Sequence, residues 1–133
     1  MTWQILSGVR RIPLTLIEAE DEVDSGDIYL QSSIETEGHE LIDELHSLIG
    51  EQITVMCIEF VQRYPEIMMD ARKQIGQPTY FARRIPTDSK IDIKKSIESQ
   101  MNLLRIADNE KYPAFFDYMG HKYLLRIEKA PGD

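Results

Sequence analysis

The sequence contains little of several residue types, and each shortage excludes a class of protein. Its 133 residues include a single cysteine, Cys57, so no disulfide can form within the chain. This shortage favours a reducing compartment, and we expect the protein to be cytoplasmic. No apolar run is long enough to cross a bilayer, and the first residues lack the basic and then apolar order of a signal peptide. The sequence therefore predicts no membrane partner.

Patterns that ligate metals are also absent. His39 and His46 lie seven residues apart, not at the three or four residues that would suit a shared ion, and no His-Glu-x-x-His pattern occurs. We therefore expect no metal site. The apolar neighbours of Cys57 favour a buried position on a helix over a nucleophilic role.

Positive charge is scarce in the first part of the chain. Through Asp70 there are three Lys or Arg and fifteen acids, a net charge of −12, whereas from Ala71 onward twelve bases face eight acids, a net charge of +4. A polyanion such as tRNA needs a broad positive surface, so nucleic acid is disfavoured as a partner. Two or three cations suffice for a small diphosphate.

The most informative segment runs from residue 14 to residue 34. Its pattern predicts a strand over 14–18, an acidic loop over 19–26 and a second strand over 27–34. The loop closes on Asp24-Ser25-Gly26. A carboxylate on a glycine-pinned turn between two strands is held still, which suits proton chemistry. The alternatives are an ordinary hairpin loop of solvated acids and a turn-capping role for Asp24.

The remaining elements are predicted from apolar spacing and from the positions of Gly and Pro. They are the end of a helix over 3–7 with Gly8 as its stop, an amphipathic helix over 40–63, a partly helical connection over 65–76, a strand over 79–84, a helix over 96–107, and a hairpin that pairs 115–119 with 122–127 across Gly120-His121.

Several segments have the order and spacing of one known family. Leu14-Thr15-Leu16-Ile17 and Val23-Asp24-Ser25-Gly26-Asp27-Ile28 are similar to a strand and a Val-Asp-Ser/Thr-Gly-Asp-Ile motif joined by an acidic loop. Residues 83–92 resemble an Arg-Arg-x-Pro-x-Asp-Ser-x-Ile-Asp segment, and Tyr112-Pro113-Ala114-Phe115-Phe116 resembles a Pro-Gly-Ala-Phe segment. The chain thus resembles the 10-formyltetrahydrofolate-dependent formyltransferases, most of all the amino-sugar N-formyltransferases and methionyl-tRNA formyltransferase-like proteins.

The resemblance implies an α/β fold. Residues 1–76 would form the carboxy-terminal part of a Rossmann-like formyltransferase core, and 77–133 a small α+β carboxy-terminal module for substrate binding or dimerisation. Part of a parallel sheet has an uncovered edge. We therefore expect apolar surface around Ile5, Leu14 and Leu16 to be exposed or covered by a partner.

The resemblance also implies roles for the acidic loop. The formyl donor would be 10-formyltetrahydrofolate, and Asp24 would be the catalytic residue, which in the family bonds a catalytic His and a water. Asp21, Glu22 and Val23 would lie beside the reduced folate, largely through backbone groups.

A second set of residues would hold the acceptor, for which the resemblance and the charge distribution favour a nucleotide-linked amino sugar. Arg83 and Arg84 would contact this small molecule, and Tyr80 would stack on its base. The alternatives are an ion pair of the arginines with Asp88 or Asp92, and core packing for Tyr80 and its neighbour Phe81.

One motif of the family is missing. The family's Asn-x-His, which polarises the formyl group and handles the proton of the amine, occurs nowhere in this sequence. We therefore expect a fragment or truncated form that is inactive alone; a truncated reading frame, a split enzyme and an incomplete record of the chain stay open. Its partner would be the missing amino-terminal half or a second copy in a homodimer. A methionyl-tRNA formyltransferase-like protein and a non-catalytic folate-binding or oligomerisation remnant stay open as well.

Overall fold

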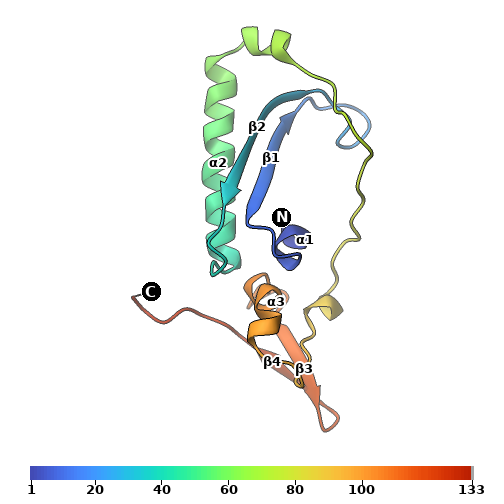
Figure 1. The fold of residues 1–133 in the computed structure, drawn as a ribbon, viewed down its shortest axis with the longest axis vertical. Helices are drawn as coiled ribbons and strands as arrows, with labels where there is room; N and C mark the ends of the chain where they lie inside the picture. Colours follow the sequence, from blue (N-terminus) through green and yellow to red (C-terminus); the bar gives the residue numbers. More distant parts are fainter. Residues whose placement is uncertain (133) are drawn as a thin grey trace. The chain divides into compact units, whose positions relative to one another are not determined.

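The computed structural model describes residues 1–132 (Figure 1). These residues form two compact units. The first unit combines residues 1–10 and 36–45 with the chain from residue 81 onward, and the second combines 11–35 with 46–80. Each unit is thus assembled from stretches that are distant in sequence. The domain boundary expected between residues 76 and 77 stays a prediction.

The second unit is built on an antiparallel ribbon. Strand β1 (Arg11–Ile17) pairs with strand β2 (Ile28–Glu35), and the register shifts by one residue between Leu16 and Ile17. Ile12 lies opposite Ile34, and both are buried. The strands predicted on either side of the acidic loop are therefore confirmed, with shifts at their ends.

One face of this ribbon is covered by a helix. Figure 1 shows α2 (Ile42–Gln62) lying along β2, and the part of α2 from His46 onward belongs to this unit. The Gln52 amide donates to the Ser32 hydroxyl over 2.9 Å. The ring of Tyr29 lies 5.3 Å from that of Phe60. The predicted amphipathic helix is confirmed. A helical turn at Glu66–Asp70 then follows within the predicted connection.

The first unit has its own core. Helix α3 (Met101–Arg105) packs near the hairpin of β3 (Ala114–Tyr118) and β4 (His121–Leu125). The buried cluster and the apolar residues packed on it are Leu104, Ala107 and Ala114 with Ile91, Met101, Leu125 and Ile127. The carboxy-terminal hairpin is therefore confirmed.

A buried ion pair fixes the loop that precedes α2 within this first unit. The Arg105 guanidinium donates 2.9 Å bonds to the Glu40 carboxylate and to the Glu40 carbonyl oxygen, and both side chains are buried. The same carboxylate accepts the backbone N–H groups of Glu37 and Gly38. A charge out of water needs such partners on every side.

Two predictions about burial are wrong. Cys57 is exposed, because it follows the buried Met56 and the turn of about 100° per residue carries it away from the inward face of α2. Ile5 is 1% exposed, because α1 (Thr2–Leu6) contacts α3. Leu14 and Leu16 are half-buried on the ribbon.

Two predicted elements also differ. Residues 79–84 form no strand, and the Ala82 carbonyl instead accepts the indole N–H of Trp3 over 3.0 Å. The helix expected over 96–107 is split into a short turn at Glu98–Gln100 and α3. Gln100 leaves the helical conformation at φ −116°, while its side chain bonds the backbone N–H and carbonyl of Asp92.

We predict that Arg105→Met lowers the free energy of unfolding by about 3–5 kcal/mol, because the Glu40 charge stays buried without its main partner. Urea denaturation followed by circular dichroism measures the change. Arg63→Met is the control, since it removes the solvent-accessible pairs with Glu59 and Asp70 and should change stability little. A small effect of Arg105→Met would contradict the role of this pair.

The same pair sets a pH dependence. Burial raises the pKa of the Glu40 carboxyl, but the N–H groups of Glu37 and Gly38 and the Arg105 guanidinium outweigh burial, so the pKa lies below its ordinary value of 4.5. The stabilisation should be fully present above pH 4.5 and lost as the pH falls through the depressed folded value. In Arg105→Met, the decrease in the free energy of unfolding between pH 4.5 and lower pH should be smaller than in the parent protein.

Candidate functional site

The acidic loop between β1 and β2 is closed by its own backbone. The Glu18 N–H donates to the Asp27 carbonyl over 2.9 Å, and the Ser25 hydroxyl donates to the Glu22 carbonyl over 2.8 Å. Asp24 has φ 59°, in the left-handed region that few residues other than Gly, Asn and Asp adopt. The turn therefore holds the backbone of Asp24 in the left-handed conformation.

Gly26 makes this turn possible. It is buried, and a Cβ added there would lie 2.0 Å from the Glu18 carbonyl oxygen. No side chain fits at that distance, so the two ends of the loop approach closely only because residue 26 is glycine.

A segment that is distant in sequence holds the loop from outside. Arg72 exchanges two backbone hydrogen bonds with Ile28, of 2.8 and 3.1 Å. Lys73 lies 3.1 Å from the Asp27 carboxylate. The Gln74 amide donates to the carbonyls of Asp24 and Gly26. We call residues 72–75 the strap.

The strap, the ribbon and the turn line an open hollow of about 380 Å³. Its lining residues are Thr15, Ile17, Asp24, Ile28, Gln31, Gln74 and Ile75. The volume falls at the low end of ligand-binding clefts, which are about 300–1,000 Å³. Asp24 is exposed and forms part of this lining.

The three residues predicted beside the folate lie on the outer part of the same loop. Asp21, Glu22 and Val23 are exposed, Val23 by 86%, and they do not line the hollow of about 380 Å³. The loop is electronegative. Burial, followed by the charge of Glu18 and a hydrogen bond to it, raises the pKa of Tyr29.

The predicted acceptor-binding arginines lie in the first unit. Arg84 Nη2 donates to the Asp88 carbonyl over 2.9 Å, whereas its Nη1 is buried with no hydrogen-bond partner among the described residues. Burial lowers the pKa of Arg84, against the opposing charge of Asp88. Within residues 1–132, neither Arg83 nor Arg84 has a carboxylate oxygen within 4 Å, so the alternative role, an ion pair with Asp88 or Asp92, is absent.

The aromatic residues of this segment are exposed, and core packing is therefore the wrong alternative for them. Tyr80, which belongs to the second unit, is 88% exposed, and Phe81 is 62% exposed. In the first unit the Trp3 ring stacks on Phe81, with centroids 5.9 Å apart. The sequence did not predict the contacts of Trp3 and Gln74, because no local pattern indicates a partner some 50 to 80 residues away.

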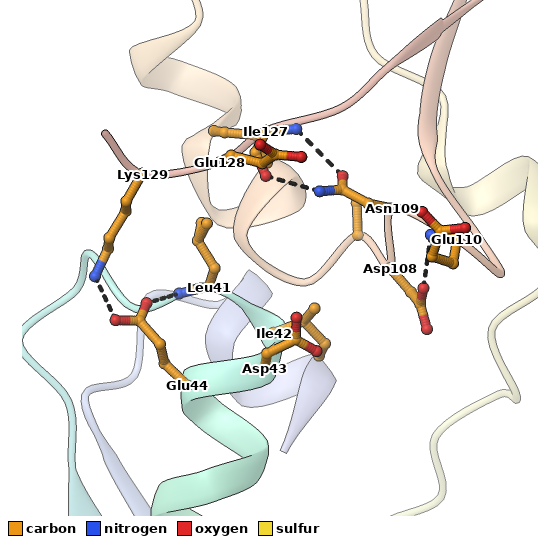
Figure 2. A pocket seen from close by; sticks show the side chains of 11 residues that line it. Leu41, Ile42, Asp43, Glu44, Asp108, Asn109, Glu110, Ile127, Glu128 and Lys129 are labelled. Atoms are coloured by element: carbon orange, nitrogen blue, oxygen red, sulfur yellow. Dashed lines mark hydrogen bonds and ion pairs between the residues drawn. The ribbon is translucent and has the colours of Figure 1, made fainter. Parts of the chain in front are cut away.

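A second hollow, of about 560 Å³, lies at the start of α2 (Figure 2). Glu44 accepts the Lys129 ammonium and the Leu41 N–H, and Asn109 exchanges two bonds with the backbone of Ile127. These contacts fix the tail after β4 to the first unit. No His, Cys, Asp and Glu cluster in the described part of the chain could hold a metal ion, and none of its helices could span a membrane.

Solved structures share this fold. Methionyl-tRNA formyltransferase from Clostridium thermocellum matches with a TM-score of 0.74 and 23% identity, covering 99% of this chain and 57% of that one. A HypX variant from Aquifex aeolicus gives a TM-score of 0.77 at 16% identity, covering 99% and 25%. A 4-N formyltransferase from Francisella tularensis gives 0.67 at 20%, covering 97% and 56%. The chain therefore has the α/β fold of part of a formyltransferase.

Sequence comparison also finds a formyltransferase. Methionyl-tRNA formyltransferase from Thermotoga maritima is 28% identical over 104 residues, which is 77% of this chain and 33% of that protein. No family profile matches the sequence. The resemblance to the formyltransferases is confirmed. The chain spans about a third of the length of this curated relative and less than three fifths of the solved chains above.

We predict that Gly26→Ala lowers the free energy of unfolding by about 3 kcal/mol, because the new methyl group collides with the Glu18 carbonyl. Thermal unfolding measures the effect. Gly50→Ala is the control: it lies on α2 with nothing within 4 Å, and it should raise stability by about 0.5–1 kcal/mol. Equal effects would contradict the close approach at Gly26.

Proposed function

We propose that this chain provides the Asp24 loop and the acceptor-binding segment of an N-formyltransferase acting on a nucleotide-linked amino sugar. The observation that carries the proposal is the placement of Asp24, on a glycine-dependent turn at the lining of a hollow of about 380 Å³. 10-Formyltetrahydrofolate would supply the formyl group when bound. Supporting the family assignment are the formyltransferase neighbours at TM-scores of 0.67 and 0.74.

Formyl transfer requires an amine to attack, an oxyanion to be stabilised and a proton to leave the new ammonium-like nitrogen. The Asp24 carboxylate would orient a catalytic imidazole and favour its protonated form. The imidazole and the asparagine of the Asn-x-His motif are absent from this sequence. The chain alone is therefore proposed to be inactive, and to need a partner that carries both residues.

The reduced folate would lie against the outer loop. The backbone groups of Asp21, Glu22 and Val23 are accessible there, since all three residues are exposed. The hollow beside Asp24 fits a ligand of modest size, being lined by the polar side chains of Thr15 and Gln31 together with apolar ones. The single cysteine of the chain supports a cytoplasmic location for this reaction.

The acceptor is proposed to be a small phosphorylated molecule. Arg84 Nη1 is buried without a partner among the described residues, and a buried guanidinium nitrogen of this kind needs an acceptor such as a phosphate oxygen. Arg83, in the same unit as Arg84, would add a second cation. Tyr80 is 88% exposed but belongs to the other unit, so its stacking on a base stays a prediction. The net charge of −8 opposes a polyanionic acceptor.

Methionyl-tRNA is the second candidate acceptor, favoured because two of the similar proteins are methionyl-tRNA formyltransferases. Titration separates the two candidates. Binding of UDP- or dTDP-linked amino sugars would support the first, whereas tRNA binding that weakens steeply with added salt would support the second. Sedimentation tests the separate expectation of a homodimer, and a clean monomer would argue against it. A chain that binds neither acceptor nor folate would be a remnant.

We predict that Arg84→Met weakens binding of the nucleotide-linked amino sugar about tenfold, because one charge-assisted hydrogen bond to phosphate is lost. Isothermal titration calorimetry measures it. Arg126→Met, which removes an exposed arginine from the same unit, should leave the affinity within about twofold. Unchanged affinity in Arg84→Met would remove this residue from the acceptor site.

We predict that Asp24→Asn lowers turnover by about 10²–10⁴-fold while folate affinity stays within a few fold, as expected when a proton relay is lost. The assay uses the chain fused after an amino-terminal formyltransferase portion that carries the Asn and His. Glu51→Gln, an acid-to-amide change on the exposed side of α2, is the control. Full turnover in Asp24→Asn would exclude this aspartate from the mechanism.

A further inference from the structure

We propose that Gln74 is the positioning residue of the Asp24 loop, a role that rests on the proposed function and deepens it. The Gln74 Nε2 atom lies 2.8 Å from the Asp24 carbonyl oxygen and 2.7 Å from that of Gly26. Both hydrogens of one amide group are thus donated to the two carbonyls that flank Ser25. A single side chain thereby fixes both ends of the turn that carries the aspartate.

The turn needs an outside support of this kind. Asp24 is held at φ 59°, a conformation that costs energy for a residue with a side chain. Its neighbours Val23 and Ser25 are exposed, so they contribute little packing. The bond from Ser25 to Glu22 stays inside the loop and cannot anchor it to the ribbon. Gln74 supplies the anchor from 48 to 50 residues away.

The strap places Gln74 accurately. Its first residue, Arg72, is tied to the start of β2 by a reciprocal pair of backbone hydrogen bonds with Ile28, and its side chain also bonds Gln31. Lys73 then pairs with Asp27. Each of these strap residues therefore contacts the loop or the strand that follows it, and Gln74 falls opposite the turn.

The position of Gln74 in the lining of the hollow links the turn to ligand binding. Gln74 and Asp24 both line it, and Gln31, which the strap contacts, lies on its ribbon side. A change in the turn would alter the position of the carboxylate and of the loop backbone together. Loss of Gln74 should therefore weaken folate binding, whereas loss of the Asp24 carboxylate alone should not.

The test compares two variants of the full chain with the parent. Gln74→Met keeps the length of the side chain and removes both donors, while Gln74→Glu keeps its shape and places a carboxylate against two carbonyl oxygens. Gln77→Met is the control, an exposed glutamine three residues further on. The readouts are hydrogen exchange of the Glu18 amide, which closes the loop through Asp27, and calorimetric titration with 5-formyltetrahydrofolate.

We expect both Gln74 variants to exchange the Glu18 amide about tenfold faster and to bind the folate about tenfold more weakly, with Gln77→Met equal to the parent. Faster exchange with unchanged folate affinity would overturn the positioning role, and so would unchanged exchange. A parent chain that does not bind the folate would refute the proposed function and this inference with it; failure of the inference alone leaves binding by the parent intact.

Discussion

The candidate site depends on the approach of Gly26 to the Glu18 carbonyl oxygen. A Cβ at residue 26 would lie 2.0 Å from that oxygen, so the loop can close at this distance only around a glycine. Closure in turn fixes where β2 begins and lets Glu18 bond Asp27. Within the closed loop, Asp24 adopts the left-handed conformation at φ 59°.

The first unit combines a buried ion pair with a small apolar core. Glu40 and Arg105 are both buried, and the pair joins the loop before α2 to the end of α3. Beside it, an apolar cluster centred on Leu104 and Ala114 packs the carboxy-terminal hairpin. Burying a charge pair gives little net stability, but it penalises any arrangement that separates the partners, and the register of these two segments is thereby specified.

Sequence reasoning predicted the elements whose signals are local. The ribbon around the acidic loop, α2 and the last hairpin follow from apolar spacing and from Gly26 and Gly120. Their existence is therefore predictable, while their ends shift by one to three residues. The strand expected over 79–84 fails because a strand requires a partner, which no local pattern reveals.

For the candidate site, too, the sequence predicts the local features and not the contacts between distant segments. The motif around Asp24 identified the turn, and the structure places this residue at a hollow. The bonds of Gln74 and the stacking of Trp3 on Phe81 join segments that are distant in sequence. No periodic pattern in the sequence indicates such contacts. The burial expected for Cys57 is wrong because its apolar neighbours face several directions around the helix: Met56 is buried, whereas Val55 and Ile58 are exposed.

The exposure of Cys57 also has a practical side. It is the only thiol of the chain, and it lies on α2, away from the strap and the acidic loop in sequence. A maleimide dye or a nitroxide would therefore attach at one known position without cysteine mutagenesis. Attached there, such a reporter would follow ligand-induced rearrangement of the ribbon unit by fluorescence or paramagnetic relaxation.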